Sequence, residues 1–448
     1  MPEFDLLIKN AKILDERGLL LEVCLGVKNE KIAFIGFDCP DSFVSNVRIN
    51  AGGSLLLPSF IDLHVHIFSP GWNKEDYSTG TMAAAVGGYG LVCDMASVGE
   101  WQTTTKEVFK KKIEEVEKNA WIDVALYAGE IYKDADLTEI PELMDMGAVG
   151  LGEIMMSEPG AIGDDALLLK AMEVVSEKNK LIAVHCENGD IINYMTRVRK
   201  PVKDLREYAN TRPPIAEAEA ILRTAMLSRY KKTRVHVCHV SSKAGSFSLR
   251  LAKRLNKHIT SEVTPHHLLL DIDNSYELKK LGVVTPPLRT KEDRIELWRS
   301  ITRRVIDVIS TDHASFYVES KENPVDYIDV PPGLPGLEYA FPVVSTYAIE
   351  HNIATLKEII EWFTSKPAII LNTFPKRGAI TVGAEANVVL VDYRKEVKID
   401  DSWISSATDY SPYLGWKVKF QVLYNIVRGN VVMENRIMAN KAGKFIKI

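Results

Sequence analysis

Two histidines separated by one residue, His64 and His66, end a mainly apolar run over residues 58–66. Successive side chains of a β-strand point to opposite faces, so residues two apart share a face. If this run is a strand, both imidazoles project the same way and are able to bind one metal ion through neutral ring nitrogens. The spacing alone is equally consistent with two unrelated histidines in a strand. The rest of the chain must decide between these interpretations.

Other apolar runs also end in side chains that bind metals: Glu153, His185, His239 and Asp312. The chain contains only 10 histidines, and four of them fall at such positions, which chance does not readily produce. Imidazole and carboxylate ligands suit zinc or a similar divalent ion. The sequence therefore predicts a metal site with one or two divalent ions per chain, zinc being the expected metal.

A metal site of this composition predicts hydrolysis. A bound divalent ion lowers the pKa of water towards ~7 and polarises a carbonyl oxygen. A carboxylate such as Asp312 is able to ligate the metal, take the proton from that water and deliver it to a leaving nitrogen. We therefore predict an amide or imide hydrolase with Asp312 as its catalytic residue.

The runs that must position these side chains alternate with helical patterns. Candidate strands occupy residues 59–66, 91–95, 123–129, 148–155, 181–187, 234–241, 259–264 and 307–311. Helical patterns fall between them, as at residues 103–119, 164–179, 215–232 and 291–304. This alternation predicts an α/β fold, a (β/α)8 barrel with its active site at the carboxyl ends of the strands. A doubly wound open sheet is the alternative, but the sequence has no glycine-rich phosphate turn of the kind that often accompanies it.

Both ends of the sequence have the pattern of short antiparallel strands. Apolar runs of strand length, separated by turn residues, fill residues 1–56 and 375–448. We predict that these two segments form one small β-sandwich domain, while residues 57–374 form the catalytic barrel.

The composition excludes several classes of protein. The chain has 448 residues, 46% hydrophobic and 26% charged, with a net charge of -5. This charge offers no broad electrostatic case for nucleic acid or an anionic membrane as partner, and no apolar run reaches the ~18 residues of a membrane span. The start of the sequence has no signal-peptide pattern, and the cysteines have no paired spacing. We expect buried free thiols at Cys93, Cys186 and Cys238, in a reducing cytoplasm.

Together these motifs resemble the amidohydrolase superfamily, and within it the branch of dihydroorotases, allantoinases and hydantoinases. The stretches that carry the resemblance are residues 62–71, 80–88, 185–187, 237–241, 264–268, 286–289, 311–314, 333–337 and 411–416. The resemblance implies that His64 and His66 hold one metal, that His185 and His239 hold a second, and that Asp312 is ligand and general base. It also implies a homodimer or homotetramer, and orienting roles for three further residues, Asp62, Glu187 and His313.

The fourth predicted strand departs from the pattern of this branch. A carboxylated lysine usually bridges the metals there, whereas this chain has Glu153 in the run 150–154 and no lysine. Glu153 is able to supply a carboxylate directly, but it lies one residue past the expected position, and such a shift reverses the face of a strand. A β-bulge would be needed to aim it inward. Otherwise the site holds one metal, or Glu153 is a structural acid.

The residues expected around the substrate also differ from the dihydroorotase pattern. Where an arginine and an asparagine would bind the substrate carboxylate, this chain has Phe68 and the run 95–97, with Thr285 and Phe316 at two further positions. An aromatic ring in place of a guanidinium removes a charge-assisted contact. Arg289 is a candidate anion contact with an alternative structural role, and the loop with Gly333 is expected to contact the ring.

Three functions remain open from the sequence. The first is a dihydroorotase-like enzyme that opens a six-membered cyclic ureide, as in pyrimidine biosynthesis, and the scaffold motifs favour it. The second is an allantoinase or a hydantoinase of the dihydropyrimidinase type, which the substitutions in the pocket favour. The third is a non-catalytic family member, against which the retained histidines and Asp312 argue. The mixed-charge run 317–326 is expected to form a loop over the site.

Overall fold

The computed structural model describes residues 3–40, 42–156 and 164–448. Parallel strands fill the middle of the sequence, and each ends near the same side of the molecule. They are β6 Phe60–Val65, β7 Tyr89–Asp94, β8 Asp123–Leu126, β9 Gly150–Met155, β10 Leu181–His185, β11 Arg234–Val237, β12 Ile259–Val263 and β13 Val308–Ile309.

These strands form two parallel sheets that follow the order of the chain. One sheet has the order β6-β7-β8 and the other β13-β12-β11-β10-β9. Backbone hydrogen bonds join the segment after β8 to β9, from Ala128 N to Gly150 O at 2.9 Å, and join the segment after β13 to β6, from Asp312 N to His64 O at 3.0 Å. The α/β class predicted from the sequence is confirmed.

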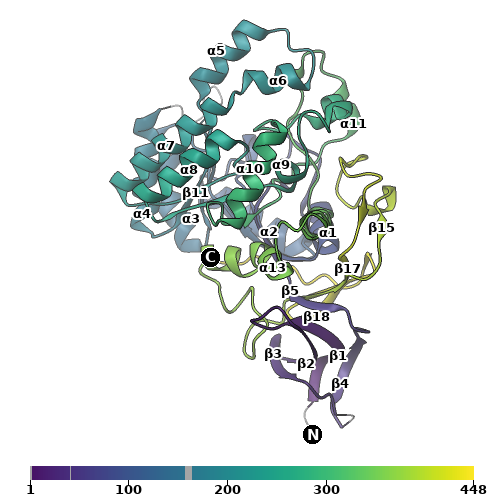
Figure 1. The fold of residues 1–448 in the computed structure, drawn as a ribbon. Helices are drawn as coiled ribbons and strands as arrows, with labels where there is room; N and C mark the ends of the chain where they lie inside the picture. Colours follow the sequence, from purple (N-terminus) through teal and green to yellow (C-terminus); the bar gives the residue numbers. More distant parts are fainter. Residues whose placement is uncertain (1–2, 41, 157–163) are drawn as a thin grey trace.

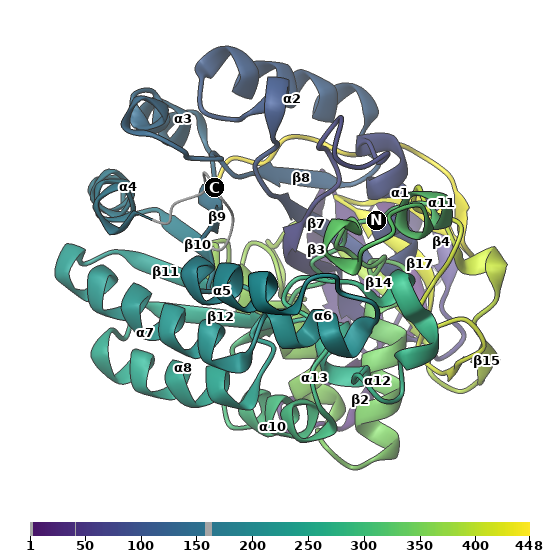
Figure 2. The ribbon, with the colours of Figure 1, turned by 90° about the horizontal axis from the view of Figure 1, so that it is seen from above.

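Helices connect the parallel strands and cover them. Figure 2 shows α2, α3, α4, α7, α8 and α10 along the outside of the strands. The helices are α1 Tyr77–Gly87, α2 Lys106–Asn119, α3 Ile140–Met146, α4 Asp165–Glu177, α5 Gly189–Arg199, α6 Leu205–Thr211, α7 Pro214–Lys231, α8 Lys243–Leu255, α9 Pro265–Leu269, α10 Lys291–Thr302, α11 Val318–Glu322, α12 Ala340–Glu350, α13 Leu356–Phe363 and α14 Ser365–Ile370.

The helix α2 illustrates how the sequence specifies these elements. The hydroxyl of Thr105 accepts a hydrogen bond from the Val108 amide and so satisfies a free donor at the helix start. Phe109 and Val116, seven residues apart, are buried against the strands, while the glutamates and most of the lysines between them face solvent. The helix predicted for residues 103–119 therefore begins at Lys106, after its capping residue.

Strands from both ends of the sequence meet in one nine-stranded sheet with the order β19-β18-β17-β14-β5-β1-β2-β3, and β4 pairs with β1. The N-terminal strands are β1 Glu3–Leu14, β2 Leu20–Lys28, β3 Lys31–Gly36, β4 Val44–Asn50 and β5 Leu55–Pro58, and the C-terminal ones are β14 Val388–Asp392, β17 Gln421–Val427, β18 Asn430–Glu434 and β19 Ile437–Met438. A separate pair is β15 Val397–Lys398 with β16 Lys417–Val418. The domain boundaries at residues 56 and 374 stay predictions.

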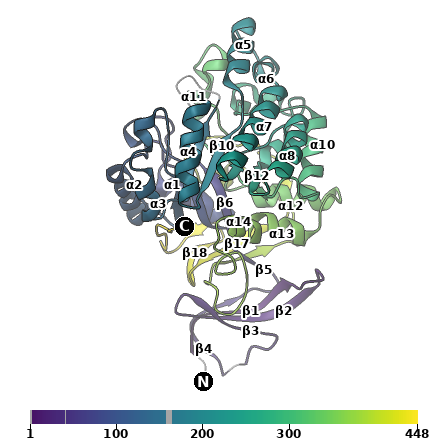
Figure 3. The same ribbon diagram turned by 90° about the vertical axis from the view of Figure 1, so that its left-hand side faces the viewer.

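The nine-stranded sheet lies at one end of the molecule. Figures 1 and 3 show β1 to β4 at the lower end, far from α5 and α6 at the upper end. The sheet is tied to the parallel strands through Asp123 at the start of β8, whose buried carboxylate pairs with Arg377 at 2.6 Å and with Arg428. No helix in the described part of the chain is both long and apolar enough to cross a membrane.

The cysteines differ in part from the expectation. Cys93, Cys186 and Cys238 are buried free thiols, as predicted. Cys24 and Cys39, by contrast, form a disulfide with a Cα–Cα distance of 5.4 Å. Antiparallel pairing of β2 with β3 places Cys24 opposite Gly36, so the chain that leaves β3 returns beside it. This pair was not expected from the sequence, because fourteen intervening residues hide the contact.

Candidate metal centre

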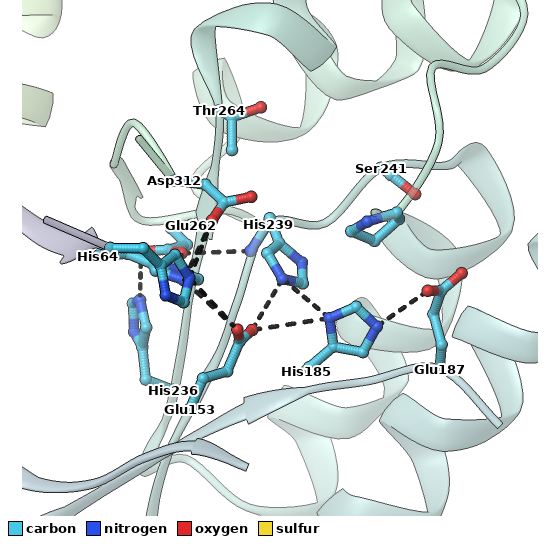
Figure 4. Close-up of polar contacts among 12 residues, drawn as sticks. His64, Glu153, His185, Glu187, His236, His239, Ser241, Glu262, Thr264 and Asp312 are labelled. Atoms are coloured by element: carbon cyan, nitrogen blue, oxygen red, sulfur yellow. Dashed lines mark hydrogen bonds and ion pairs between the residues drawn. The ribbon is translucent and has the colours of Figure 1, made fainter. Parts of the chain in front are cut away.

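Imidazoles and carboxylates from five strands meet at the carboxyl ends of the parallel strands (Figure 4). His64 lies in β6, with His66 just after it, Glu153 lies in β9, His185 ends β10, and His239 and Asp312 follow β11 and β13. The structure thus brings together all the residues that the sequence predicted as metal ligands: His64, His66, Glu153, His185, His239 and Asp312. Two overlapping groups of three, His64–His66–Glu153 and Glu153–His185–His239, have ligand atoms within 4.8 Å of one another.

The histidines form two pairs with facing ring nitrogens. Nε2 of His64 lies 3.1 Å from Nε2 of His66, and Nδ1 of His185 lies 3.1 Å from Nε2 of His239. Two nitrogens that each lie about 2.0–2.1 Å from one zinc ion would be separated by about this distance. Each pair therefore fits a divalent ion.

Glu153 reaches both histidine pairs. Its Oε1 lies 2.8 Å from His239 and 3.7 Å from His185, while its Oε2 lies 3.5 Å from His64 and 3.8 Å from His66. Oε1 is buried and, among the described residues, has no partner with hydrogen-bond geometry. A buried carboxylate oxygen without such a partner is costly unless a cation compensates it, so this atom also fits a bound metal.

A β-bulge aims Glu153 inward. Ile182 of β10 pairs with Leu151, but Val184 pairs with Ile154, so three steps along β9 match two along β10. The extra residue shifts the alternation of side chains at this point. The bulge that the sequence argument required is present.

The site holds concentrated negative charge in a buried place. Burial disfavours the charged forms, yet Glu262, Glu153 and Asp312 hold the pKa of His64 well above its usual value. Burial likewise opposes ionisation of Glu153, but the neighbouring His64 and His239 keep its pKa well below the usual range. The carboxylates therefore stay ionised, and their negative charge favours a cation bound among them.

A second layer of acids orients the histidine rings. Nδ1 of His64 donates to Glu262 at 2.5 Å, and Nε2 of His185 donates to Glu187 at 2.9 Å. Each contact leaves the other ring nitrogen facing the centre. Asp62 accepts hydrogen bonds from the backbone amides of His64 and Thr311 and so fixes the ends of β6 and β13 together.

Sequence reasoning missed Glu262 and Glu75. Glu262 lies in β12 and also contacts Nε2 of His236 at 3.0 Å. Its signal in the sequence is an acid within a mostly buried strand, one residue before the strand ends at Val263. Glu75 contacts Nε2 of His313 at 2.8 Å, and Nδ1 of His313 accepts from the Gly336 amide at 3.0 Å, so His313 supports the loop at residues 333–337.

A cavity of about 200 Å³ opens onto the metal centre. Asp312, Glu153, His66 and His185 reach its wall. The other described lining residues are Ser69, Trp72, Ala96, Val98, Glu130, Tyr132, Met155, Val284, Thr285, Ala314, Pro332 and Gly333. Of the residues predicted to contact substrate, Thr285 and Gly333 therefore lie at this cavity.

Phe68, Phe316 and Arg289 are not among the described residues that line the cavity. Phe68 stacks on Tyr77 at a ring distance of 4.7 Å, and Phe316 packs edge-on against Trp72 at 5.2 Å. Arg289 donates to Ser241 Oγ at 3.2 Å and lies 3.6 Å from Glu187. Phe316 thus packs against Trp72 of the cavity wall, whereas Phe68 packs against a residue outside the lining. Arg289 has the buried polar contacts of a structural residue, which is the alternative role stated from the sequence.

A fold of parallel strands whose ends gather imidazoles and carboxylates defines the class of metal-dependent hydrolases. The Amidohydrolase family model matches residues 55–432, and the chain belongs to this family. The resemblance stated from the motifs is confirmed, and so is the prediction of an enzyme, a hydrolase acting on C–N bonds in cyclic amides.

Relatives and solved structures of similar proteins match over nearly the whole chain. A dihydroorotase of Bacillus cytotoxicus is 31% identical over 432 residues, 96% of this chain and 98% of the relative. An L-hydantoinase (dihydropyrimidinase) from Arthrobacter aurescens has a TM-score of 0.92 at 29% identity, covering 99% of this chain and 100% of that one. A dihydropyrimidinase from Brevibacillus agri has a TM-score of 0.90 at 25% identity, with 98% of each chain covered.

Proposed function

We propose that the six converging side chains hold one or two divalent ions, with zinc as the metal, and that the ring of a cyclic ureide is opened by hydrolysis beside them. His64 and His66 would hold one ion, His185 and His239 the other, and Glu153 would bridge them. The support is the pair of 3.1 Å nitrogen separations with a carboxylate oxygen directed at each. A bound ion would supply a hydroxide-like water and polarise the ring carbonyl.

Asp312 has the placement that a proton carrier needs. Its Oδ1 lies 3.3 Å from His64 and 3.4 Å from His66, and the same side chain reaches the cavity wall. It is thus able to take the proton of the attacking water and pass it to the ring nitrogen as the C–N bond breaks. Glu262 and Glu187 hold the histidine rings in place meanwhile.

Replacing the proton carrier tests this role. In Asp312→Asn, kcat should fall by about 10²–10⁴-fold, because the amide cannot accept the proton. Metal content, measured by elemental analysis, should stay within twofold of the wild type if the histidines carry most of the binding. Retention of more than a third of the wild-type kcat with full metal content would remove Asp312 from the reaction.

Dihydroorotate is the first candidate substrate, as predicted from the sequence. The curated relatives from Bacillus cytotoxicus and Bacillus cereus are named dihydroorotases, at 31% and 30% identity over almost the full chain. Such an activity would place the enzyme in pyrimidine biosynthesis.

A hydantoinase-type, dihydropyrimidinase-type or allantoinase-type activity is the second candidate, and the charge of the cavity favours it. Among the described lining residues none is a lysine or arginine, whereas Glu130 carries a carboxylate into the wall. The segment 157–163, which lies outside the description, contains neither cationic type. A ring carboxylate would thus find no cationic side chain among these lining residues and would meet the like charge of Glu130, which disfavours its binding.

A panel of substrates distinguishes the two candidates. Turnover is compared for dihydroorotate, allantoin, hydantoin and dihydrouracil with zinc-loaded protein, following ring opening by absorbance. Opening of a neutral ring at ten times the kcat/KM of dihydroorotate or more supports the second candidate, and the reverse supports the first. Turnover of none of the four would contradict the proposed function.

We also infer a closed (β/α)8 barrel and a β-sandwich built from both ends of the chain. The support is the set of hydrogen bonds that join the segment after β8 to β9 and the segment after β13 to β6, together with the high TM-scores to hydantoinase structures. The location that we propose is the cytoplasm, which the three buried free thiols support and against which the Cys24–Cys39 disulfide stands.

A homodimer or homotetramer is the assembly that we propose. Three neighbouring helices carry exposed apolar side chains at helical spacing: Tyr194 and Val198 on α5, Ile215, Met226 and Tyr230 on α7, and Phe247 and Leu255 on α8. The helix α7 contacts both α5 and α8, so these side chains lie on adjoining elements, and exposed apolar side chains that gather on one surface usually mark a protein interface. Light scattering on Met226→Glu should show a smaller assembly than the wild type, and an unchanged mass would remove this surface from the interface.

A further inference from the structure

Lys321 is a fully buried lysine beside the cavity. It lies on α11, in the mixed-charge run 317–326, and its side chain is 0% exposed. In the described part of the chain no carboxylate forms an ion pair with it. Burial holds its pKa well below the usual range. A buried lysine without an acid is costly, so its position needs a specific reason.

The Lys321 amine donates to two backbone carbonyls, those of Val283 at 2.9 Å and Gly333 at 2.5 Å. Charged or neutral, a lysine amine has enough N–H groups to make both bonds. The two carbonyls belong to different loops, and each loop supplies part of the cavity wall, Val284 with Thr285 and Pro332 with Gly333. The lysine thus joins the two backbone segments from behind.

Other hydrogen bonds hold each loop separately, such as Ala314 N to Leu334 O at 3.2 Å and Tyr208 Oη with Thr285 Oγ1 at 2.8 Å, but few bonds among the described residues join the two loops to each other. Neither segment belongs to a helix or strand. The Gly333 amide donates to Val283 O at 3.1 Å, and Tyr410 Oη contacts Gly333 O at 3.4 Å. Lys321 donates to the same two oxygens, Val283 O and Gly333 O. All of these contacts therefore involve the backbone groups of residues 283 and 333.

We propose that Lys321 is a positioning residue that sets the distance between the two loops and thereby the fit of the ring substrate. This role rests on the proposed function, since it concerns the cavity where the ring would bind. The amine would influence the substrate only indirectly, by holding the backbone of residues 283 and 333 in place, and no contact with the proposed metal ligands is among its hydrogen bonds in the described part of the chain. Its loss should therefore affect ring binding more than the chemical step.

The variant Lys321→Met tests this role because it keeps the length of the side chain and removes both donors. KM for the ring that is turned over should rise by about tenfold or more, while kcat stays within about threefold and metal content is unchanged. Lys280→Met is the matched control, since Lys280 also donates to two carbonyls, of Glu322 and Pro324, that lie outside the cavity wall. Its KM should stay near the wild-type value.

Hydrogen exchange gives a second measurement that needs no substrate. The Gly333 amide should exchange about tenfold faster or more in Lys321→Met and at the wild-type rate in Lys280→Met. If no ring is turned over, the proposed function fails, yet this measurement still tests Lys321. An unchanged KM and unchanged exchange at Gly333 would overturn the inference, as would equal effects of both variants.

Where Lys321→Met does not fold, Lys321→Gln is measured instead, because its polar amide is easier to accommodate while its nitrogen ends one bond short of the lysine amine and so does not reach both carbonyls. A rise in KM without a matching fall in kcat supports the positioning role. A wild-type KM, or a loss of kcat alone, contradicts it.

Discussion

Removing the negative charge of Glu153 is the most informative change at the proposed metal centre. Glu153→Gln keeps the size of the side chain but leaves one weak acceptor oxygen where two charged oxygens faced the two histidine pairs. Those oxygens lie between 2.8 and 3.8 Å from the four ring nitrogens. The variant therefore weakens both proposed ion sites together.

The expected loss of metal affinity follows from this placement. Removing a residue that only orients a ligand typically costs 10–100-fold in metal affinity. Glu153 would contact the ions directly, so we expect the zinc dissociation constant to rise by about 100-fold or more, about 2.8 kcal/mol at 1.4 kcal/mol per tenfold change. The weaker of the two ions should be lost first.

Competition with a zinc-binding chromophore measures this change on protein first stripped of metal. Glu130→Gln is the matched control, because Glu130 lines the same cavity and loses the same charge without belonging to either ligand group. Its zinc affinity should stay within about threefold of the wild type. An unaltered affinity in Glu153→Gln, or equal losses in both variants, would refute the bridging role.

Three further changes are expected. Glu262→Gln weakens the bond that orients His64, so zinc affinity should fall by about 10–100-fold, and an unchanged affinity in the same titration would contradict this role. Asp123→Ala leaves two buried arginines without their acid and should lower the free energy of unfolding, measured by urea denaturation, by about 3–5 kcal/mol. A loss below about 1 kcal/mol would show that this ion-pair cluster is not needed for stability. Burial lowers the pKa of His266 to about 4, below the unfolded value near 6.5, so this residue should contribute a loss of about 2 kcal/mol of stability between pH 7 and pH 5 in metal-free protein. The change in stability between these pH values should therefore differ by about this amount in His266→Phe, and an identical change in both proteins would contradict the contribution.

The arrangement of the centre could be predicted because it depends on local alternation. His64 and His66 share a face since a strand repeats every two residues, and His185, His239 and Asp312 follow apolar runs that had to be parallel strands. Parallel strands in an α/β fold end on one side, so side chains far apart in the sequence had to meet. No detailed geometry was needed for this step.

Features that depend on tertiary pairing could not be predicted in the same way. The bulge beside Glu153 results from the register of β9 against β10, which the sequence of β9 alone does not specify. Phe68 and Phe316 lie in loops, whose direction depends on what packs around them, and neither is among the described residues that line the cavity. Lys321 lacked any pattern in the sequence that distinguishes it from an exposed lysine.

A crystal structure of zinc-loaded protein with anomalous diffraction at the zinc edge tests the central claim most directly. One or two strong anomalous peaks are expected within about 2.0–2.2 Å of ring nitrogens of His64, His66, His185 or His239, with a Glu153 oxygen at the same distance. Absence of any anomalous peak among these side chains, in protein that binds zinc stoichiometrically in solution, would contradict the claim.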